Sequence, residues 1–503
     1  MKSIRHTSLI AAILCGTTAN ADVTAQQVWD NWTEQMAVYG QGFTTSGEDM
    51  SAGTLTISDV KIEMSDDEAT ITALLGDIAL TENGDGTVSI TVADSYPITI
   101  NATPQYGDPV KANLTVSQEN MSLTVSGDPE AMVYDIAADR YALSLDNLEG
   151  DQSMDVEVVD AVIAMLNVAG QYSVSEDTLT RIDYAFNIGA LDIDMLFNEI
   201  DAGGTISGNA DIADLAMFAK IAAPIDMDMN AEQPPFADGL AFEGGYTFGN
   251  LSYAFDFDVK NDQGSGSATV DSGILSVAFD MDGALYSGTS KGIDITMSIP
   301  NEIPFPLQAS MAQYGFDFDI PLSQGTDGPR DARLGFNFTE LAISDTIWNL
   351  VDPQTILPRE AVTVAIGLSA KVTPFFDFLD PAQQEAAMMT DVPGELNSVE
   401  ITELVVKGAG AEITGDGAFT FDNSDLQTFD GFPRPEGQVN FAINGVNGLI
   451  DNLIQMGLIP QEEAMMPRMM MGMFTTPVGD DMLTSTIEVN SEGHALANGQ
   501  RLR

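Results

Sequence analysis

Two copies of a Phe-Asp-Phe-Asp sequence, at 255–258 and 316–319, hold the carboxylates best spaced for chemistry. On a strand, Asp256 and Asp258 would project from one face about 7 Å apart, as would Asp317 and Asp319. Such a pair can bind a cation, or serve as acid and base in a hydrolase. On an outer face, the same pair simply keeps a strand solvated and discourages aggregation. We favour this second interpretation and predict no catalytic residues, with a carboxylate-based hydrolase as an alternative function.

Methionines form the second candidate group. Six of them crowd one short segment near the C-terminus: Met465, Met466, Met469, Met470, Met471 and Met473. Flexible thioether side chains suit a surface that accepts varied apolar ligands. We therefore name Met465, Met466, Met469, Met470 and Met473 as candidate ligand-binding residues. Because the chain has 25 methionines, we favour filling of the core over a ligand-binding surface.

Other motifs point to turns rather than to sites. Asn83-Gly84-Asp85-Gly86 resembles part of a calcium loop, but Thr81 and Val92 stand where the loop needs acidic ligands. We predict a hairpin turn there, and another at Thr414-Gly415-Asp416-Gly417. His494 follows Ser-Glu-Gly and also fits a turn. No metal site and no cofactor are predicted.

The N-terminus has the three parts of a secretory signal. A short basic segment precedes an apolar stretch over residues 9–14, which is too short to span a bilayer. Ala19-Asn20-Ala21 is typical of a cleavage site. We predict a signal peptide over residues 1–21, cleavage between Ala21 and Asp22, and a periplasmic protein without a transmembrane anchor. Cys15 could mark a lipoprotein, but Leu14 stands where a small residue is expected.

Cleavage would leave a very acidic chain. It removes two of the 18 basic residues and none of the 76 acidic ones, so the mature net charge is 16 − 76 = −60. The one cysteine is removed as well, and His494 is the only histidine that remains. Disulfides, a cysteine nucleophile and common zinc sites are thereby excluded. The charge also argues against nucleic acid as a partner.

The hydrophobic pattern predicts a mainly β fold. Period-two alternation is clear at 253–259, 316–320, 362–368 and 439–443. We expect extended, twisted antiparallel sheets with a few packed helices. The expected helices are a short N-terminal one after Thr24, one from Pro381 to Met389, and a helical pair near 447–474. Residues 154–169 and 209–222 suit either helix or strand.

Two features concern the organisation of the chain. Polar, Pro-rich residues at 230–235 suggest a boundary between an N-terminal β-rich domain (22–229) and a C-terminal β-rich domain with helices (236–503). Near Ser58-Asp59 the alternation slips by one residue, between Leu55/Ile57 and Val60/Ile62. A bulge or tight bend there would keep both halves facing one core.

Three stretches carry a family resemblance. They are VTAQQVWDNWTEQMAVYG from Val23, the stretch from Ile347 to Val372 with its core WNLVDPQTILPR, and the C-terminal part from DNLIQMGLIPQEEAMM to the final NGQRLR. Together they resemble an exported alphaproteobacterial family of unknown function, which implies a cell-envelope protein but no site residues. The segment 399–454 is also similar in texture to AsmA-like envelope proteins, which implies long sheets and lipid handling.

The expected function is non-enzymatic. We predict a periplasmic protein that shelters an apolar ligand, such as a lipid, in a sheet-lined groove, or that acts as an envelope assembly factor with a protein partner. The alternatives are the carboxylate-based periplasmic hydrolase and an outer-membrane-associated structural protein.

Overall fold

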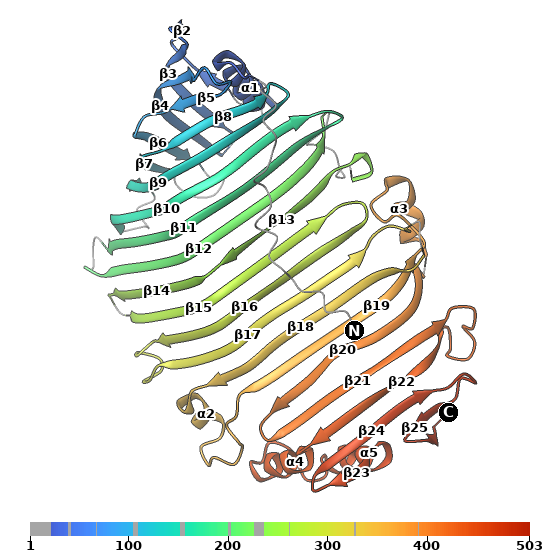
Figure 1. The fold of residues 1–503 in the computed structure, drawn as a ribbon. Coiled ribbons are helices and arrows are strands. Elements are labelled where there is room, and N and C mark those ends of the chain that lie inside the picture. Colours follow the sequence, from blue (N-terminus) through green and yellow to red (C-terminus); the bar gives the residue numbers. More distant parts are fainter. Residues whose placement is uncertain are drawn as a thin grey trace.

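One antiparallel sheet makes up most of the molecule. The structure is a computed structural model that describes residues 22–38, 42–66, 68–103, 109–150, 156–199, 203–225, 236–260, 262–325, 328–390 and 392–502. Within these ranges the chain forms 26 strands in one sheet and five α-helices. Figure 1 shows a long, twisted sheet with the first strands at one end and the last strands at the other. The predicted mainly β fold is confirmed, as a single sheet.

The strands are long in the middle of the sheet and short at its two ends. Their bounds are β1 (Gly42–Thr44), β2 (Gly47–Ser51), β3 (Thr54–Ser65), β4 (Ala69–Glu82), β5 (Val88–Thr91), β6 (Ser95–Ala102), β7 (Val110–Glu119), β8 (Ser122–Asp128), β9 (Ala131–Glu149), β10 (Val156–Glu176), β11 (Leu179–Glu199), β12 (Thr205–Pro224), β13 (Ala241–Phe248), β14 (Asn250–Val259), β15 (Asp262–Phe279), β16 (Gly283–Ser298), β17 (Leu307–Pro321), β18 (Arg330–Ile343), β19 (Val362–Pro374), β20 (Gly394–Gly408), β21 (Ala411–Asp422), β22 (Arg434–Asn444), β23 (Thr476–Gly479), β24 (Met482–Val489), β25 (Ala495–Ala497) and β26 (Gln500–Arg501).

Strand order follows the sequence. From β9 to β12 and from β15 to β22, each strand pairs with the strand that follows it. In places two short strands share one position, as β13 and β14 do between β12 and β15. Residues 154–169 and 209–222, which the sequence left open, belong to β10 and β12 as far as they are described.

The predicted domain boundary falls within this sheet. Its break at 230–235 lies outside the described residues. The strands on either side of it, β12 and β13, pair directly through Ala216 to Ala222 and Ala241 to Thr247. The sheet is therefore continuous across that break, and both predicted halves share it.

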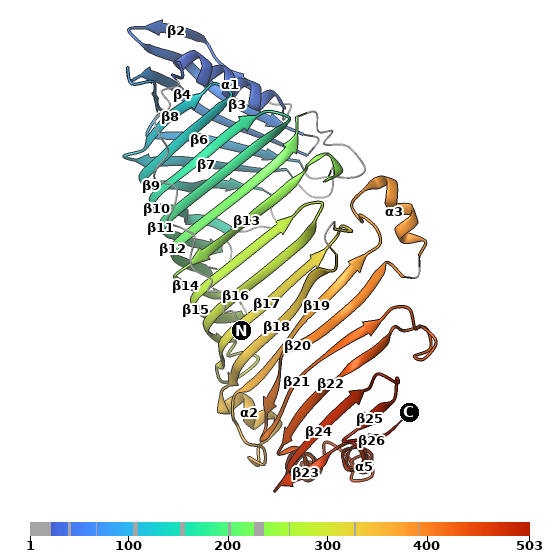
Figure 2. The ribbon, with the colours of Figure 1, turned by 45° about the vertical axis from the view of Figure 1, so that its right-hand side comes forward.

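The helices lie at the ends and edges of the sheet: α1 (Ala25–Val38), α2 (Asp345–Val351), α3 (Pro381–Met388), α4 (Val446–Gln455) and α5 (Met465–Phe474). Figures 1 and 2 place α1 beside the first strands and α5 beside the last ones. The predicted capping box is present, because the Thr24 amide donates to Gln27 Oε1 at 2.9 Å. Asp380 caps α3 as expected. The short helix α2 was not predicted.

One predicted turn is correct and one is wrong. Asn83-Gly84-Asp85-Gly86 does connect β4 to β5. Gly415 and Gly417, in contrast, lie inside β21, and the turn before that strand falls at Ala409 and Gly410, both with positive φ. These strand glycines make room for neighbours: a Cβ on Gly415 would come 2.8 Å from Leu404 and 3.1 Å from Phe441.

A line of Asp, Asn and Gly residues, which ends at Glu340, crosses the sheet between β3 and β18, and we call it the seam. Between Asp59 and Asp77, and from Asn120 to Gly292, consecutive members lie opposite or beside one another on neighbouring strands, where the ladder pairing is interrupted. Glu340 lies two strands from Gly292, with β17 between them. Six of them, Asp59, Asn120, Asn167, Asp214, Gly292 and Glu340, have φ between 51° and 62°. The other members are Asp77, Asp139, Gly189, Gly249 and Asp271.

The seam shifts the side-chain alternation by one residue on each strand. On β12, Ala210 and Ile212 precede Asp214 on one face, and Leu215 and Met217 continue that face beyond it. Ile212, Leu215 and Met217 accordingly pack in one hydrophobic cluster. The bend expected near Asp59 is confirmed as the first seam position, where the pairing register shifts between Ile57 and Val60. At the six left-handed positions the chain thus keeps its apolar side chains on one face across the seam.

Candidate functional site

The two faces of the sheet differ in chemistry. Residues that pair directly across an antiparallel ladder share a face, so the registers assign every strand position. On β14, Tyr253, Phe255 and Phe257 point to one side, while Asp256 and Asp258 point to the other. We call these sides the apolar face and the polar face. Along the ladder, Phe255 lies opposite Gly208 and Gly266, and Gly266 lies opposite Met297.

The apolar face is exposed over most of its length. Fifteen large apolar side chains on it are 37–48% exposed. They are Ile163, Met195, Ile206, Phe242, Tyr246, Tyr253, Tyr286, Ile295, Met297, Tyr314, Ile320, Leu334, Phe336, Ile366 and Val406. From β10 to β24 the face spans about a dozen strand-to-strand steps, or ~58 Å.

Aromatic rings on this face lie flat over glycines of the neighbouring strand. A Cβ on Gly264 would come 2.6 Å from the ring of Phe257, and one on Gly288 would come 2.7 Å from Phe316. The rings also contact one another: Phe255 and Phe257 stack with an interplanar angle of 5°. Glycine-supported rings of this kind leave a smooth, continuous apolar surface.

Helix α1 covers the N-terminal end of the same face. Val28 and Trp29 pack against Leu55, Ile57 and Leu80, and all of these side chains are buried. Trp29 Nε1 donates to Glu48 Oε1 at 3.0 Å. Burial beneath α1 also raises the pKa of Tyr134 to about 12. Beneath α1 the apolar face is therefore part of an ordinary hydrophobic core. Beyond β10 the same face is exposed to solvent.

Near the C-terminal end of the sheet, a hydrogen bond holds helix α5 against the apolar face. Ser485 lies on that face, opposite Phe441, and its hydroxyl donates to the Phe474 carbonyl at 2.6 Å. The five candidate methionines of α5, Met465, Met466, Met469, Met470 and Met473, are 50–65% exposed. For these five, core filling is therefore the wrong explanation. Their role in ligand binding stays a prediction.

No known family model, curated protein or solved structure matches this chain. The resemblance to an exported family, drawn from the sequence, therefore stays a prediction. The assignment of a site rests on the geometry of the sheet alone.

The two Phe-Asp-Phe-Asp carboxylate pairs lie far apart. Asp256 pairs with Ser265, which pairs with Ser298 of β16, whereas Asp317 pairs with Ser287 of that same strand. Eleven residues of strand separate these two points, or roughly 36 Å. The carboxylates of β14 and β17 therefore cannot act on one substrate. Asp319 is also engaged by Arg333 at 2.7 Å.

An open hollow of about 510 Å³ lies on the polar face. Asp160, Asp194 and Asp256 line it, together with serines and Asn209. Among the residues that the structure describes, no three His, Cys, Asp or Glu side chains come together as metal ligands. His494 lies in its predicted turn, and its Nδ1 is 3.2 Å from Glu492.

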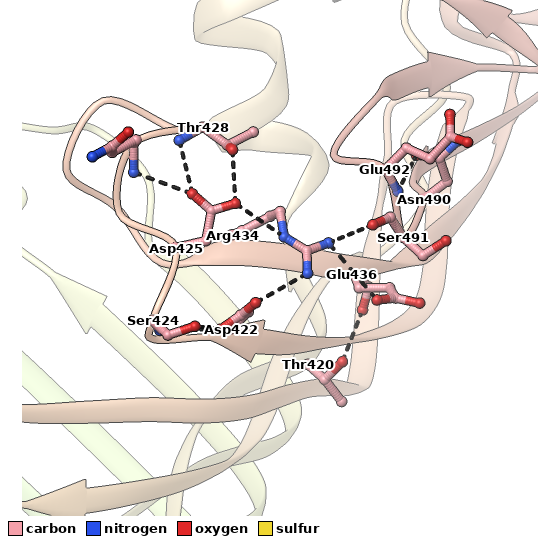
Figure 3. Close-up of polar contacts among 11 residues, drawn as sticks. Thr420, Asp422, Ser424, Asp425, Thr428, Arg434, Glu436, Asn490, Ser491 and Glu492 are labelled. Atoms are coloured by element: carbon pink, nitrogen blue, oxygen red, sulfur yellow. Dashed lines mark hydrogen bonds and ion pairs between the residues drawn. The ribbon is translucent and has the colours of Figure 1, made fainter.

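A dense polar cluster surrounds Arg434 (Figure 3). Its guanidinium contacts Asp422 at 3.1 Å and Asp425 at 3.3 Å, and it donates to the Ser491 carbonyl at 2.9 Å. Hydrogen bonds from the Ser424 hydroxyl, and then from Arg434, lower the pKa of Asp422. These contacts fasten the loop before β22 to the turn after β24, so we assign the cluster a structural role.

Sequence reasoning found the aromatic strands but not their shared exposed face. That face depends on which strands pair and on the seam. Only the first seam position, at Asp59, was recognised in the sequence as a one-residue slip in the hydrophobic alternation. The Asp, Asn or Gly that recurs at most changes of alternation is the signal that could have found the rest. No helix in the described part of the chain is long and apolar enough to span a membrane. Ala21, on the N-terminal side of the predicted cleavage site, lies outside the described residues.

Proposed function

We propose that this protein is a non-enzymatic protein of the periplasm that binds lipid acyl chains along the apolar face. The observation that carries this proposal is the set of fifteen large apolar side chains gathered on one face. Leaving them partly in water forgoes on the order of 10 kcal/mol of apolar burial. Isolated exposed apolar residues are common, but a contiguous surface of this size is typical of a binding site.

Acyl chains fit this surface better than a second copy of the protein does. The chain carries a formal net charge of −58, so two copies repel each other when they approach. A neutral hydrocarbon chain adds no charge. It also matches a long strip on which Tyr246, Tyr253, Tyr286 and Tyr314 carry single hydroxyls on otherwise apolar rings. Such hydroxyls can meet the ester or head-group oxygens of a lipid.

Protein purified from its own periplasm, without detergent, provides the test. Native mass spectrometry should find lipid bound to the folded chain, and organic extraction of the same sample should release it. Protein that is released by osmotic shock and is repeatedly free of lipid would contradict the proposal. Co-purification of one defined protein, instead of lipid, would favour an envelope assembly factor and would also contradict it.

A further inference from the structure

Helix α5 packs with its one charged residue, Arg468, on the inward side. At about 100° per residue, Ala464, Arg468 and Met471 fall on one side of the helix. Ala464 is buried, Arg468 and Met471 are partly buried, and Arg468 contacts Asp451 at 2.6 Å. The opposite side carries four of the exposed methionines, Met466, Met469, Met470 and Met473. An ordinary surface helix places its charged residues outward and its apolar residues inward.

The residue types on the outward side are uniform. The apolar face of the sheet mixes Ile, Tyr, Phe, Leu, Val and Met, as a surface selected for apolar area would. All four outward positions of α5 from Met466 to Met473 are methionine. What these side chains share with one another, and not with leucine or isoleucine, is a thioether sulfur.

Their spacing brings several sulfur atoms within reach of one point. Positions 466, 469, 470 and 473 follow the i, i+3, i+4, i+7 pattern, which places successive Cβ atoms about 5–6 Å apart. Each sulfur sits on a flexible, unbranched side chain, so three of them can converge on one ion. Neutral thioethers are soft ligands that select Cu(I) over hard divalent cations.

We propose that the outward side of α5 is a binding site for one soft monovalent cation, Cu(I), formed by thioethers from Met466, Met469, Met470 and Met473. The surrounding acidic protein favours a cation there, because neutral ligands leave the ion its full positive charge. The same carboxylates do not compete for it, since hard oxygen ligands prefer other metals. This site is independent of lipid binding on the sheet.

Titration of the full mature chain with Ag(I), a redox-stable analogue of Cu(I), tests the site. Isothermal calorimetry in chloride-free buffer should find one tight ion per chain. A variant with Met466→Leu, Met469→Leu, Met470→Leu and Met473→Leu keeps the apolar area but loses the sulfur atoms. It should bind Ag(I) at least tenfold more weakly. Competition with a chromophoric Cu(I) ligand under anaerobic conditions should likewise show that the unaltered chain binds Cu(I) more tightly than the fourfold variant.

The matched control is the pair Met388→Leu and Met389→Leu. These methionines end and follow α3, are 79% and 81% exposed, and should not affect binding. Circular dichroism checks that each variant folds. If the fourfold variant does not fold, the single change Met469→Leu replaces it and should weaken Ag(I) binding in part. Equal Ag(I) affinity in the α5 variant and the unaltered chain would overturn the proposal, as would an equal loss in the α3 control.

Discussion

Phe257 of β14 lies across Gly264, the residue directly opposite it on β15. A side chain on Gly264 would displace the ring, because its Cβ would come 2.6 Å from the ring edge. The same kind of contact recurs on the apolar face, where aromatic rings lie flat over glycines of the neighbouring strand and together make a smooth surface.

Gly264→Ala should therefore destabilise the protein by about 1–3 kcal/mol, since the ring must lift from the sheet. Urea unfolding followed by circular dichroism measures the change. Gly47→Ala on β2 is the control, because a Cβ there meets nothing within 4 Å. In the Phe257→Leu background the cost of Gly264→Ala should largely disappear. If the losses in unfolding free energy of the two single variants simply added in the double variant, Phe257 and the new Cβ would not be in contact.

The seam makes a prediction about backbone conformation. Asn167 has φ 52°, and a β-branched residue adopts that region poorly. Asn167→Val should cost about 1–2 kcal/mol, whereas Asn167→Gly should be close to neutral. Gln171→Val, four residues further along β10, is the control. Stability that is the same in all three variants would argue against strain at the seam.

Helix α1 should act as a fixed cover on the N-terminal end of the apolar face. Trp29 is only 3% exposed, and its ring centre lies 5.0 Å from that of Phe43. Trp29→Ala should cost about 3–5 kcal/mol. Trp29→Phe keeps most of the packing and loses the hydrogen bond to Glu48, so it should cost only ~1 kcal/mol. Thermal unfolding of both variants would test this ranking, and a negligible effect of Trp29→Ala would contradict it.

Asp352 should make stability depend on pH. The hydrogen bond from the Ile356 amide, with further help from Leu357 and Arg359, holds the pKa of Asp352 below its ordinary value. The unfolded chain therefore binds this proton more readily than the folded chain does. The contribution of Asp352 is complete near neutral pH and is lost as the pH falls below about 4.

The variant Asp352→Asn isolates this effect. The difference in unfolding free energy between the unaltered chain and the variant should be largest near neutral pH and should shrink below about pH 4. Urea midpoints across this range measure it. A difference that grows as the solution becomes more acidic would have the wrong sign.

Much of the fold could be predicted from the sequence, because alternation is a local signal. The strands around Phe255, Phe316 and Val439 and the caps at Thr24 and Asp380 are fixed by residues that are neighbours in the chain. Helix α2 was not predicted because its seven residues are too few to show a helical hydrophobic periodicity. Gly415 and Gly417 were misassigned because a glycine that makes room for a close neighbour on the next strand, here Phe441 or Val439, looks in sequence like a turn glycine.

The candidate site could be predicted less well. Whether Ile295 is buried or exposed depends on what covers the sheet, and no pattern along β16 records that. The methionines of α5 illustrate the same limit, since the sequence favoured the core for Met466 and Met470. The structure instead places both on the surface.

Two neighbours on β16 allow the most direct test of lipid binding. Ile295 lies on the apolar face, opposite Ala268, and Thr296 lies on the polar face, opposite Ser267. A charge at the first position should repel an acyl chain, because an unpaired charge is costly in an apolar contact. Binding of a fluorescent fatty-acid probe to the folded protein should weaken roughly tenfold or more in Ile295→Glu and stay unchanged in Thr296→Glu. Equal binding in the two variants would contradict a lipid site on this face.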